Sequence, residues 1–153
     1  MSVPVVPITA DLEDMASLVR SIMEKLNNSK ESVLEIKTEL ADLRSQVEKA
    51  NWVIMTSEFK EDVLSNLTTL LRDLTTYLSN IDKIIGYEVR ALEFLTKLLK
   101  EGNNETFRDK ILAFLQTEKK CIEIDLKIIQ IGSTLMRNTR NYMDVIKKVC
   151  PQS

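Results

Sequence analysis

The residues that could do chemistry in this chain of 153 residues do not include histidine. Histidine is the commonest general base, the usual activator of a serine or cysteine nucleophile and a frequent metal ligand. Di-metal carboxylate sites in helical bundles normally use a Glu-x-x-His motif, which cannot form here. The three glycines are scattered singly, so there is no glycine-rich phosphate loop. The sequence therefore predicts a protein that is not an enzyme and holds no metal or cofactor.

The two cysteines, Cys121 and Cys150, are too few for a disulfide framework and too isolated for a zinc site. Cys150 opens the C-terminal tetrapeptide Cys-Pro-Gln-Ser, which has the length of a prenylation box and follows Lys147 and Lys148. The middle pair, Pro-Gln, fits such a box poorly. The favoured interpretation of Cys150 is a last core contact, and lipidation is the alternative.

The elements that must position these residues are long helices. Only three Gly and three Pro occur, and two of the prolines lie within the first seven residues, so the middle of the chain has few helix breakers. Apolar residues recur there at alternating steps of three and four, the heptad pattern of helices that supercoil. We predict an all-α fold, an elongated antiparallel three-helix bundle with coiled-coil-like packing. The expected organisation is an extended tail at 1–8, a single bundle at 9–150 with helices at about 9–55, 57–101 and 104–149, and a tail at 151–153.

The heptad pattern also predicts which residues face the other helices. The seam of the first expected helix runs from Leu12 to Ile54, and Thr9 or Asp11 is the expected cap. The last expected helix carries two adjacent apolar stripes. Its predicted seam consists of Phe107, Lys110, Phe114, Thr117, Cys121, Ile124, Ile128, Ile131, Leu135, Asn138, Tyr142, Val145 and Val149, and the companion stripe consists of Leu115, Ile122, Ile129, Met136 and Met143.

The two connections are not equally clear. Gly102-Asn103-Asn104 tolerates positive φ and predicts a tight turn between antiparallel helices. The first connection lacks Gly and Pro, although Thr56 or Ser57 can cap a helix. We favour a turn there. The alternative is a continuous rod of the first two helices that forms a coiled-coil dimer.

A few polar residues interrupt the predicted seams. They are Ser29, Glu88, Lys110, Thr117 and Asn138. Ser29, Glu88, Thr117 and Asn138 are candidate core positions that set the helix register or contact a partner, as a single core Asn does in coiled coils. The alternative is that each side chain stays solvated at an edge of the bundle. The tail Val3-Pro4-Val5-Val6-Pro7 is apolar and extended, and is a candidate docking segment.

The charge pattern bears on the class of partner. The net charge is −2, which argues against nucleic acid. Residues 102–153 nevertheless carry nine bases and six acids, a mildly cationic third. No basic-then-apolar leader and no apolar run of about 18 residues is present. We therefore expect a cytoplasmic protein.

The sequence predicts a protein–protein interaction module, a helical scaffold or adaptor subunit that self-associates or binds a helical partner. The breadth of the apolar stripes supports this, because it exceeds what three helices need. One alternative is a peripheral membrane module that uses the cationic C-terminal helix. A second alternative is a viral or secreted effector that binds a host protein.

Overall fold

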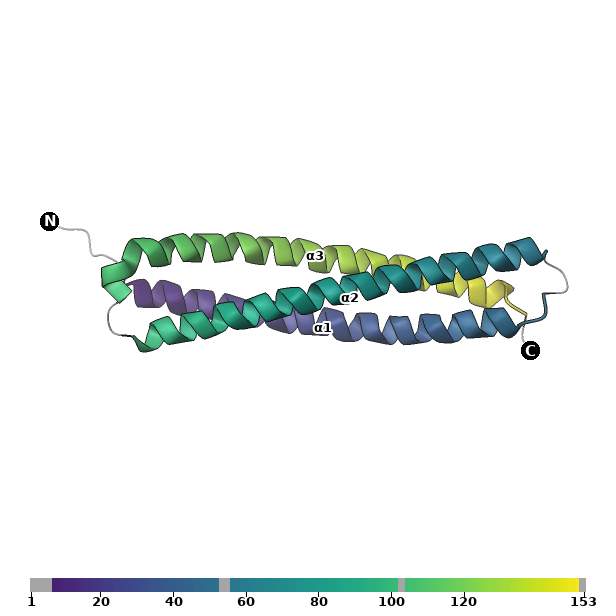
Figure 1. The fold of residues 1–153 in the computed structure, drawn as a ribbon, viewed down its shortest axis with the longest axis horizontal. Coiled ribbons are helices and arrows are strands. Elements are labelled where there is room, and N and C mark those ends of the chain that lie inside the picture. The colour runs from purple at the N-terminus through teal and green to yellow at the C-terminus, as the bar shows by residue number, and fades with distance from the viewer. Residues whose placement is uncertain (1–6, 53–55, 102–103, 152–153) are drawn as a thin grey trace. The chain divides into compact units, whose positions relative to one another are not determined.

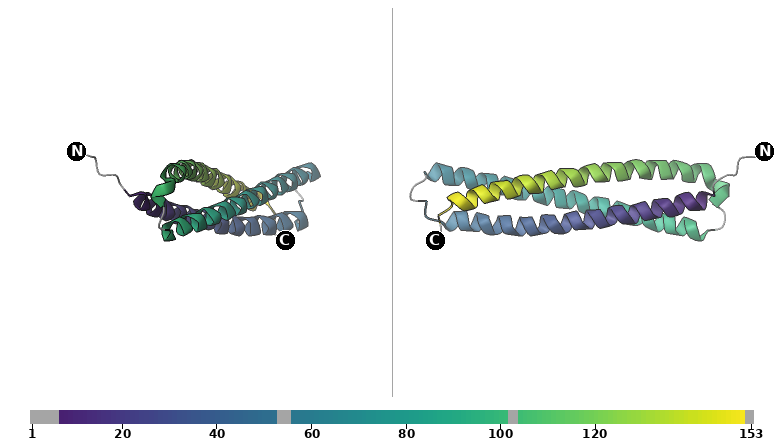
Figure 2. Two further views of the ribbon diagram at one scale, coloured as in Figure 1. Left: turned by 60° about the vertical axis from the view of Figure 1, so that its left-hand side comes forward. Right: turned by 180° about the vertical axis from the view of Figure 1, so that it is seen from behind.

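The computed structural model describes residues 7–52, 56–101 and 104–151. The elements are α1 (Ile8–Lys49), α2 (Ser57–Lys100), the short 3-10 helix η1 (Asn104–Phe107) and α3 (Arg108–Val149). The three long helices pack antiparallel as a bundle, which confirms the predicted fold class (Figure 1). α1 and α3 run in the same direction and α2 runs in the opposite one (Figure 2). No strand occurs within the described ranges.

The chain forms two compact units, and each contains a segment of every long helix. Unit 1 consists of Met1–Asn27 and Asp82–Ile129, and unit 2 consists of Asn28–Ile81 and Gln130–Ser153. Each unit therefore has its own three-helix core.

α1 follows the predicted heptad seam along its length. Its buried apolar residues are Ile8, Leu12, Met15, Ala16, Val19, Ile22, Leu26, Val33, Ile36, Leu40, Leu43 and Val47, and Ala50 just beyond the helix is also buried. Ser29 is the one polar residue that α1 buries in the described part of the chain. The alternating spacing keeps this stripe on one side of the helix, where it contributes to both cores. Ile54, the last predicted member of the seam, lies outside the described residues.

The rod alternative is wrong, because α1 ends at Lys49 and α2 runs back along it. The Thr56 hydroxyl accepts a hydrogen bond from the backbone N–H of Phe59 at 3.2 Å. Thr56 is therefore the cap of α2, and of the two predicted candidates, Thr56 and Ser57, the first is confirmed. Lys60 Nζ donates to the carbonyl of Glu48 at 2.7 Å, which satisfies one of the free carbonyls at the end of α1.

The predicted cap of α1 is wrong. The helix begins at Ile8, so Thr9 and Asp11 lie inside its first turn. The backbone N–H of Ile8 instead donates to Glu105 Oε1 of η1 at 3.2 Å. Glu105 also pairs with Arg108 at 3.0 Å. A carboxylate from 97 residues away thus occupies the positive end of the α1 dipole, which no local pattern reveals.

The turn after α2 is closed by a buried side chain. Asn104, in the predicted Gly-Asn-Asn turn, donates from Nδ2 to the carbonyl of Leu98 at 2.6 Å. Asn104 is only 8% exposed, so its amide satisfies a helix-end carbonyl away from water. Gly102 and Asn103 lie outside the described residues.

The predicted seam of α3 is wrong for one of its two rows. The row of Phe114, Cys121, Ile128, Leu135 and Tyr142 is half-buried, whereas the other row is exposed and the companion stripe is buried or half-buried. The buried residues of α3 are Ile111, Leu115, Glu118, Ile122, Asp125, Gly132, Thr139, Met143 and Ile146. In the exposed row, Ile124 is 55% exposed and Ile131 is 64% exposed. Periodicity does not choose between two neighbouring stripes of equal period, and the choice depends on which side chains fit the other helices.

Candidate functional site

Three carboxyl groups lie together in the core of unit 1. Glu88 comes from α2, and Glu118 and Asp125 come from α3, one heptad apart. Glu88 and Glu118 are fully buried and Asp125 is 5% exposed. The residues that α1 buries in this unit are all apolar. We call Glu88, Glu118 and Asp125 the carboxyl layer.

The carboxyl layer has no base to balance it. No buried Lys or Arg occurs in the described part of the chain. Both oxygens of Glu88 and of Glu118, and Oδ2 of Asp125, lack a partner when the three groups are treated as carboxylates. Ionised carboxylates only accept hydrogen bonds, so a proton is needed before any two of them can bond. A proton on Glu88 makes it a donor to Glu118 or Asp125.

The pKa values of the layer follow from this environment. Burial, and then hydrogen bonding to Glu118 and Asp125, raises the pKa of Glu88 to about 10. Burial also raises the pKa of Asp125, and the charge of Glu118 raises it further, while its hydrogen bond with Glu88 acts in the opposite direction. Glu88 therefore carries a proton at neutral pH.

Two further titratable side chains lie beside the layer. Cys121 Sγ donates to the hydroxyl oxygen of Tyr87 at 3.7 Å. The pKa of Tyr87 is raised, first by its bond with Cys121, then by burial and by the charge of Glu118. The phenol therefore stays neutral over the physiological range. No group of three or more His, Cys, Asp or Glu in the described ranges has an arrangement that could hold a metal ion.

In unit 2 the three helices meet at a close contact between Ser29 of α1, Tyr77 of α2 and Gly132 of α3. The Ser29 and Tyr77 hydroxyls are hydrogen-bonded at 2.8 Å. A Cβ atom on Gly132 would overlap the hydroxyl and ring of Tyr77 and would lie 2.7 Å from its Cε2. Only glycine leaves room for the phenol at this position. The contact therefore limits how far α3 can turn about its own axis in this unit.

Because the companion stripe faces inward, the exposed members of the predicted seam of α3 form a row that no described element covers. We call it the outer stripe. Its exposed apolar members are Phe107, just before α3, and Ile124, Ile131, Val145 and Val149 on α3. Phe107 and Ile124 belong to unit 1 and the other three to unit 2. Ile131 at 64% and Val145 at 56% are the most exposed large apolar side chains in the described residues.

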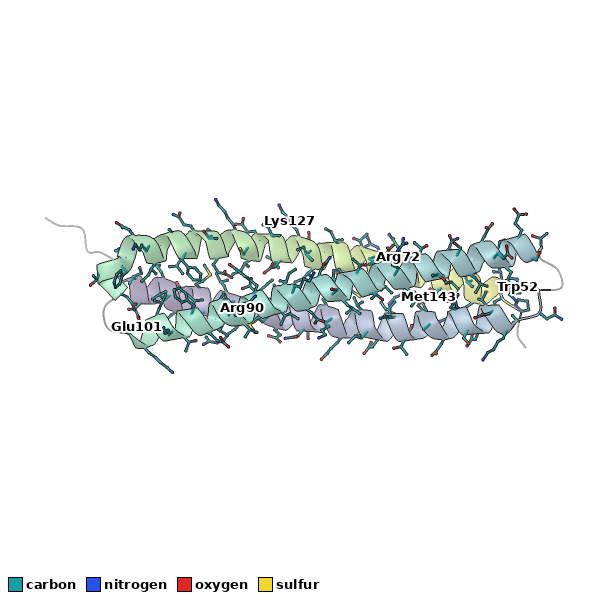
Figure 3. The ribbon with its side chains drawn as sticks, viewed as in Figure 1. Trp52, Arg72, Arg90, Glu101, Lys127 and Met143 are labelled. Atoms are coloured by element: carbon teal, nitrogen blue, oxygen red, sulfur yellow. The ribbon has the colours of Figure 1, made fainter. Side chains whose placement is uncertain are left out.

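The surroundings of the outer stripe are cationic. α3 has nine Lys and Arg and five Asp and Glu, and two of those acids, Glu118 and Asp125, are buried in the carboxyl layer. Lys120, Lys127 and Lys148 are exposed and lie at heptad spacing along one flank of the stripe. Lys127 lies on the outer side of α3 (Figure 3). The outer face of α3 is thus a narrow apolar row with a positive border.

The structure separates the four polar positions singled out in the sequence. Ser29 is buried and bonded to Tyr77, and Glu88 is fully buried in the carboxyl layer. Thr117 and Asn138 are exposed and lie on the outer stripe, so they are not core positions. The Thr117 hydroxyl donates to the carbonyl of Ala113 within its own helix, at 3.1 Å. Lys110 is exposed as well.

Sequence reasoning missed Glu118, Asp125 and Gly132 as functional positions. All three lie at heptad spacing, each one residue beyond a member of the predicted seam. The companion stripe and this row together have the same three-four spacing as the predicted seam. That spacing is the signal in the sequence that could identify these three residues as core positions. This row contains two acids and a glycine and is less apolar than the predicted seam, so hydropathy alone does not indicate that it is buried.

The two chain-end candidates are placed only in part. Pro7 is exposed, and its carbonyl accepts from the backbone N–H of Ala10 at 3.1 Å. Val3, Pro4, Val5 and Val6 lie outside the described residues. Cys150 is a half-buried free thiol whose pKa is raised by burial and lowered by the charge of Lys60. The prediction that Cys150 is lipidated stays a prediction.

Comparison of the chain with protein-family models, with curated proteins and with solved structures gave no match. None of the described helices carries an apolar stretch long enough to cross a membrane.

Proposed function

We propose that the protein is a non-enzymatic helical interaction module, an adaptor or scaffold subunit whose outer stripe binds an amphipathic helix of a protein partner. The observation that carries this proposal is the outer stripe itself. Its members Ile124, Ile131 and Val145 are more than half exposed and lie on one face of α3, seven and fourteen residues apart. In either unit, a partner helix could lie along that unit's part of the stripe and remove its side chains from water.

The border of the stripe indicates the charge of the partner. Lys120, Lys127 and Lys148 flank the row, so a partner helix with acidic residues beside its apolar stripe would be attracted and held in register. If two copies of the protein packed their α3 helices face to face, the lysines of one copy would lie near the lysines of the other and repel them. Self-association through this stripe is therefore disfavoured, and a different, acidic chain is the expected occupant.

A hollow in unit 1 adds a second contact for a helix that binds along unit 1's part of the stripe. It has a volume of about 220 Å³, and Phe94, Leu98, Phe107, Ile111 and Phe114 are among the residues that line it. The rings of Phe94 and Phe114 pack edge to face at 4.9 Å, which gives the hollow an aromatic wall. It lies at the start of the outer stripe, where an apolar side chain of the partner could anchor.

The test uses a synthetic helix with Leu and Ile at its heptad core positions and Glu at the flanking positions, and a matched peptide with Lys in place of Glu. We expect the acidic peptide to bind and the basic one not to bind, as measured by isothermal titration calorimetry. Ile131→Asp should abolish binding, whereas Ser133→Asp, at an exposed position off the stripe, should leave most of it.

Two results would contradict the proposal. If both peptides or neither bind, the outer stripe is not a face for acidic helices. If the protein sediments with vesicles that contain acidic lipid, and Ile131→Asp prevents this, the cationic face of α3 addresses a membrane surface instead.

We also infer a reducing, cytoplasmic setting. Cys121 and Cys150 are free thiols, and free thiols persist where glutathione and thioredoxin keep them reduced.

A further inference from the structure

Unit 1 closes around the carboxyl layer and, among its described residues, buries no base that would balance its charge. Glu88 and Glu118 are fully buried, and their oxygens have no donor until one of the carboxyl groups holds a proton. We propose that unit 1 is a proton-dependent switch, in which the three helix segments pack together while the carboxyl layer holds protons and separate as the layer loses them.

None of the described groups that face the carboxyl layer supplies a positive charge. Its negative charge can therefore be neutralised only by protonation. α1 contributes only apolar side chains to the core of this unit. α2 adds Tyr87 and α3 adds Cys121, both neutral in the form that makes their mutual hydrogen bond. Every described Lys and Arg of unit 1 is exposed except the half-buried Arg108, which pairs with Glu105. Ionisation of the layer would therefore leave buried charge without a counter-charge, which is strongly unfavourable.

The direction of the pH effect follows from proton linkage. The pKa of Glu88 and that of Asp125 are both raised in the folded unit, chiefly by burial. Between the unfolded and folded pKa values the closed unit therefore binds protons that the open unit releases. Its stability is fully present below the unfolded values and falls as pH rises toward about 10, the pKa of folded Glu88. Each proton released on opening makes the opening constant rise about tenfold per pH unit.

Unit 2 supplies an internal reference. The polar residues that it buries in the described ranges are Ser29 and Thr139, whose hydroxyls do not titrate in this range, and its buried phenol, Tyr77, has a pKa above the ordinary value. Opening of unit 2 should therefore not depend on pH in the same way.

The experiment is hydrogen exchange followed by mass spectrometry on the whole protein between pH 5 and pH 9, with rates corrected for intrinsic exchange. We expect protection in peptides of unit 1 to fall by about tenfold or more per pH unit. Protection in peptides of unit 2 should change far less. Glu88→Gln keeps the shape of the side chain and supplies a permanent hydrogen-bond donor. It should therefore lessen the loss of protection in unit 1 by about a factor of ten per pH unit.

Two variants serve as controls. Glu93→Gln, on the same helix but exposed, should leave the wild-type profile unchanged. Cys121→Ser keeps a donor to Tyr87 but removes the thiol, and should also leave the profile unchanged. The proposal is overturned if unit 1 shows constant protection from pH 5 to pH 9, if both units lose protection equally, or if Glu88→Gln keeps the wild-type slope. If Glu88→Gln does not fold, the wild-type comparison of the two units decides the question.

Discussion

Replacing Gly132 with alanine tests whether the contact between Ser29, Tyr77 and Gly132 holds unit 2 together. In the interior of a helix this change normally stabilises a protein by about 1 kcal/mol. Here the added methyl group would overlap the phenol of Tyr77. Overpacking of this kind typically costs about 1–3 kcal/mol. Displacement of the phenol would also break its 2.8 Å hydrogen bond with Ser29, worth about 1 kcal/mol. We therefore expect a net loss of about 1–3 kcal/mol in the free energy of unfolding.

The assay is urea unfolding, followed by circular dichroism and by the fluorescence of Trp52, which lies in unit 2 with the contact. Gly86→Ala is the matched control, because a Cβ atom there would meet nothing within 4 Å. It should stabilise the protein by about 1 kcal/mol. Tyr77→Phe removes the hydroxyl nearest to the added methyl and should lessen the cost of Gly132→Ala in a double-mutant cycle. A stabilising effect of Gly132→Ala equal to that of Gly86→Ala would refute the reasoning.

Two predictions concern the end of the bundle where α1 begins and α2 ends. Asn104→Ala should lower the free energy of unfolding by about 1–2 kcal/mol, because the carbonyl of Leu98 loses its buried donor; urea unfolding checks this, and an equal loss on Asn141→Ala, at an exposed position, would contradict it. The pKa of Glu105 is lowered, first by the backbone N–H of Ile8 and then by Arg108, so its contribution is present above its unfolded pKa and is lost as pH falls through the folded one. Glu105→Gln should therefore destabilise the protein at pH 7 and have little effect near pH 2, and an equal effect at both pH values would show that the charge is not responsible.

The helices and most of their boundaries could be predicted from local patterns. The absence of breakers, the heptad spacing of α1 and the capping residue Thr56 act within a few residues of chain, so their effects can be recognised without knowing what packs against them. The cap of α1 could not be predicted in this way. Glu105 reaches Ile8 only after the chain has run down α1, back along α2 and through the second turn.

The candidate sites were predicted only in part, for a related reason. Glu88 could be recognised as a polar residue in an apolar seam. Its partners Glu118 and Asp125 lie one position away from the row that looked most apolar. The rotation of α3 decides which of two adjacent rows is buried, and in unit 2 that rotation depends on the fit of Tyr77 against Gly132. Such a fit between separate helices leaves no periodic signal.

The sequence alone was sufficient to determine that this protein is built from long heptad-patterned helices and that it lacks histidine. These are properties of composition and spacing, and they hold wherever the helices pack. Only the tertiary structure decided which face of α3 points inward. That rotation buries two acids beside Glu88 and leaves Ile124, Ile131 and Val145 exposed. The physical reason is that burial depends on the volume and shape available between helices, which side chains distant in the sequence define together.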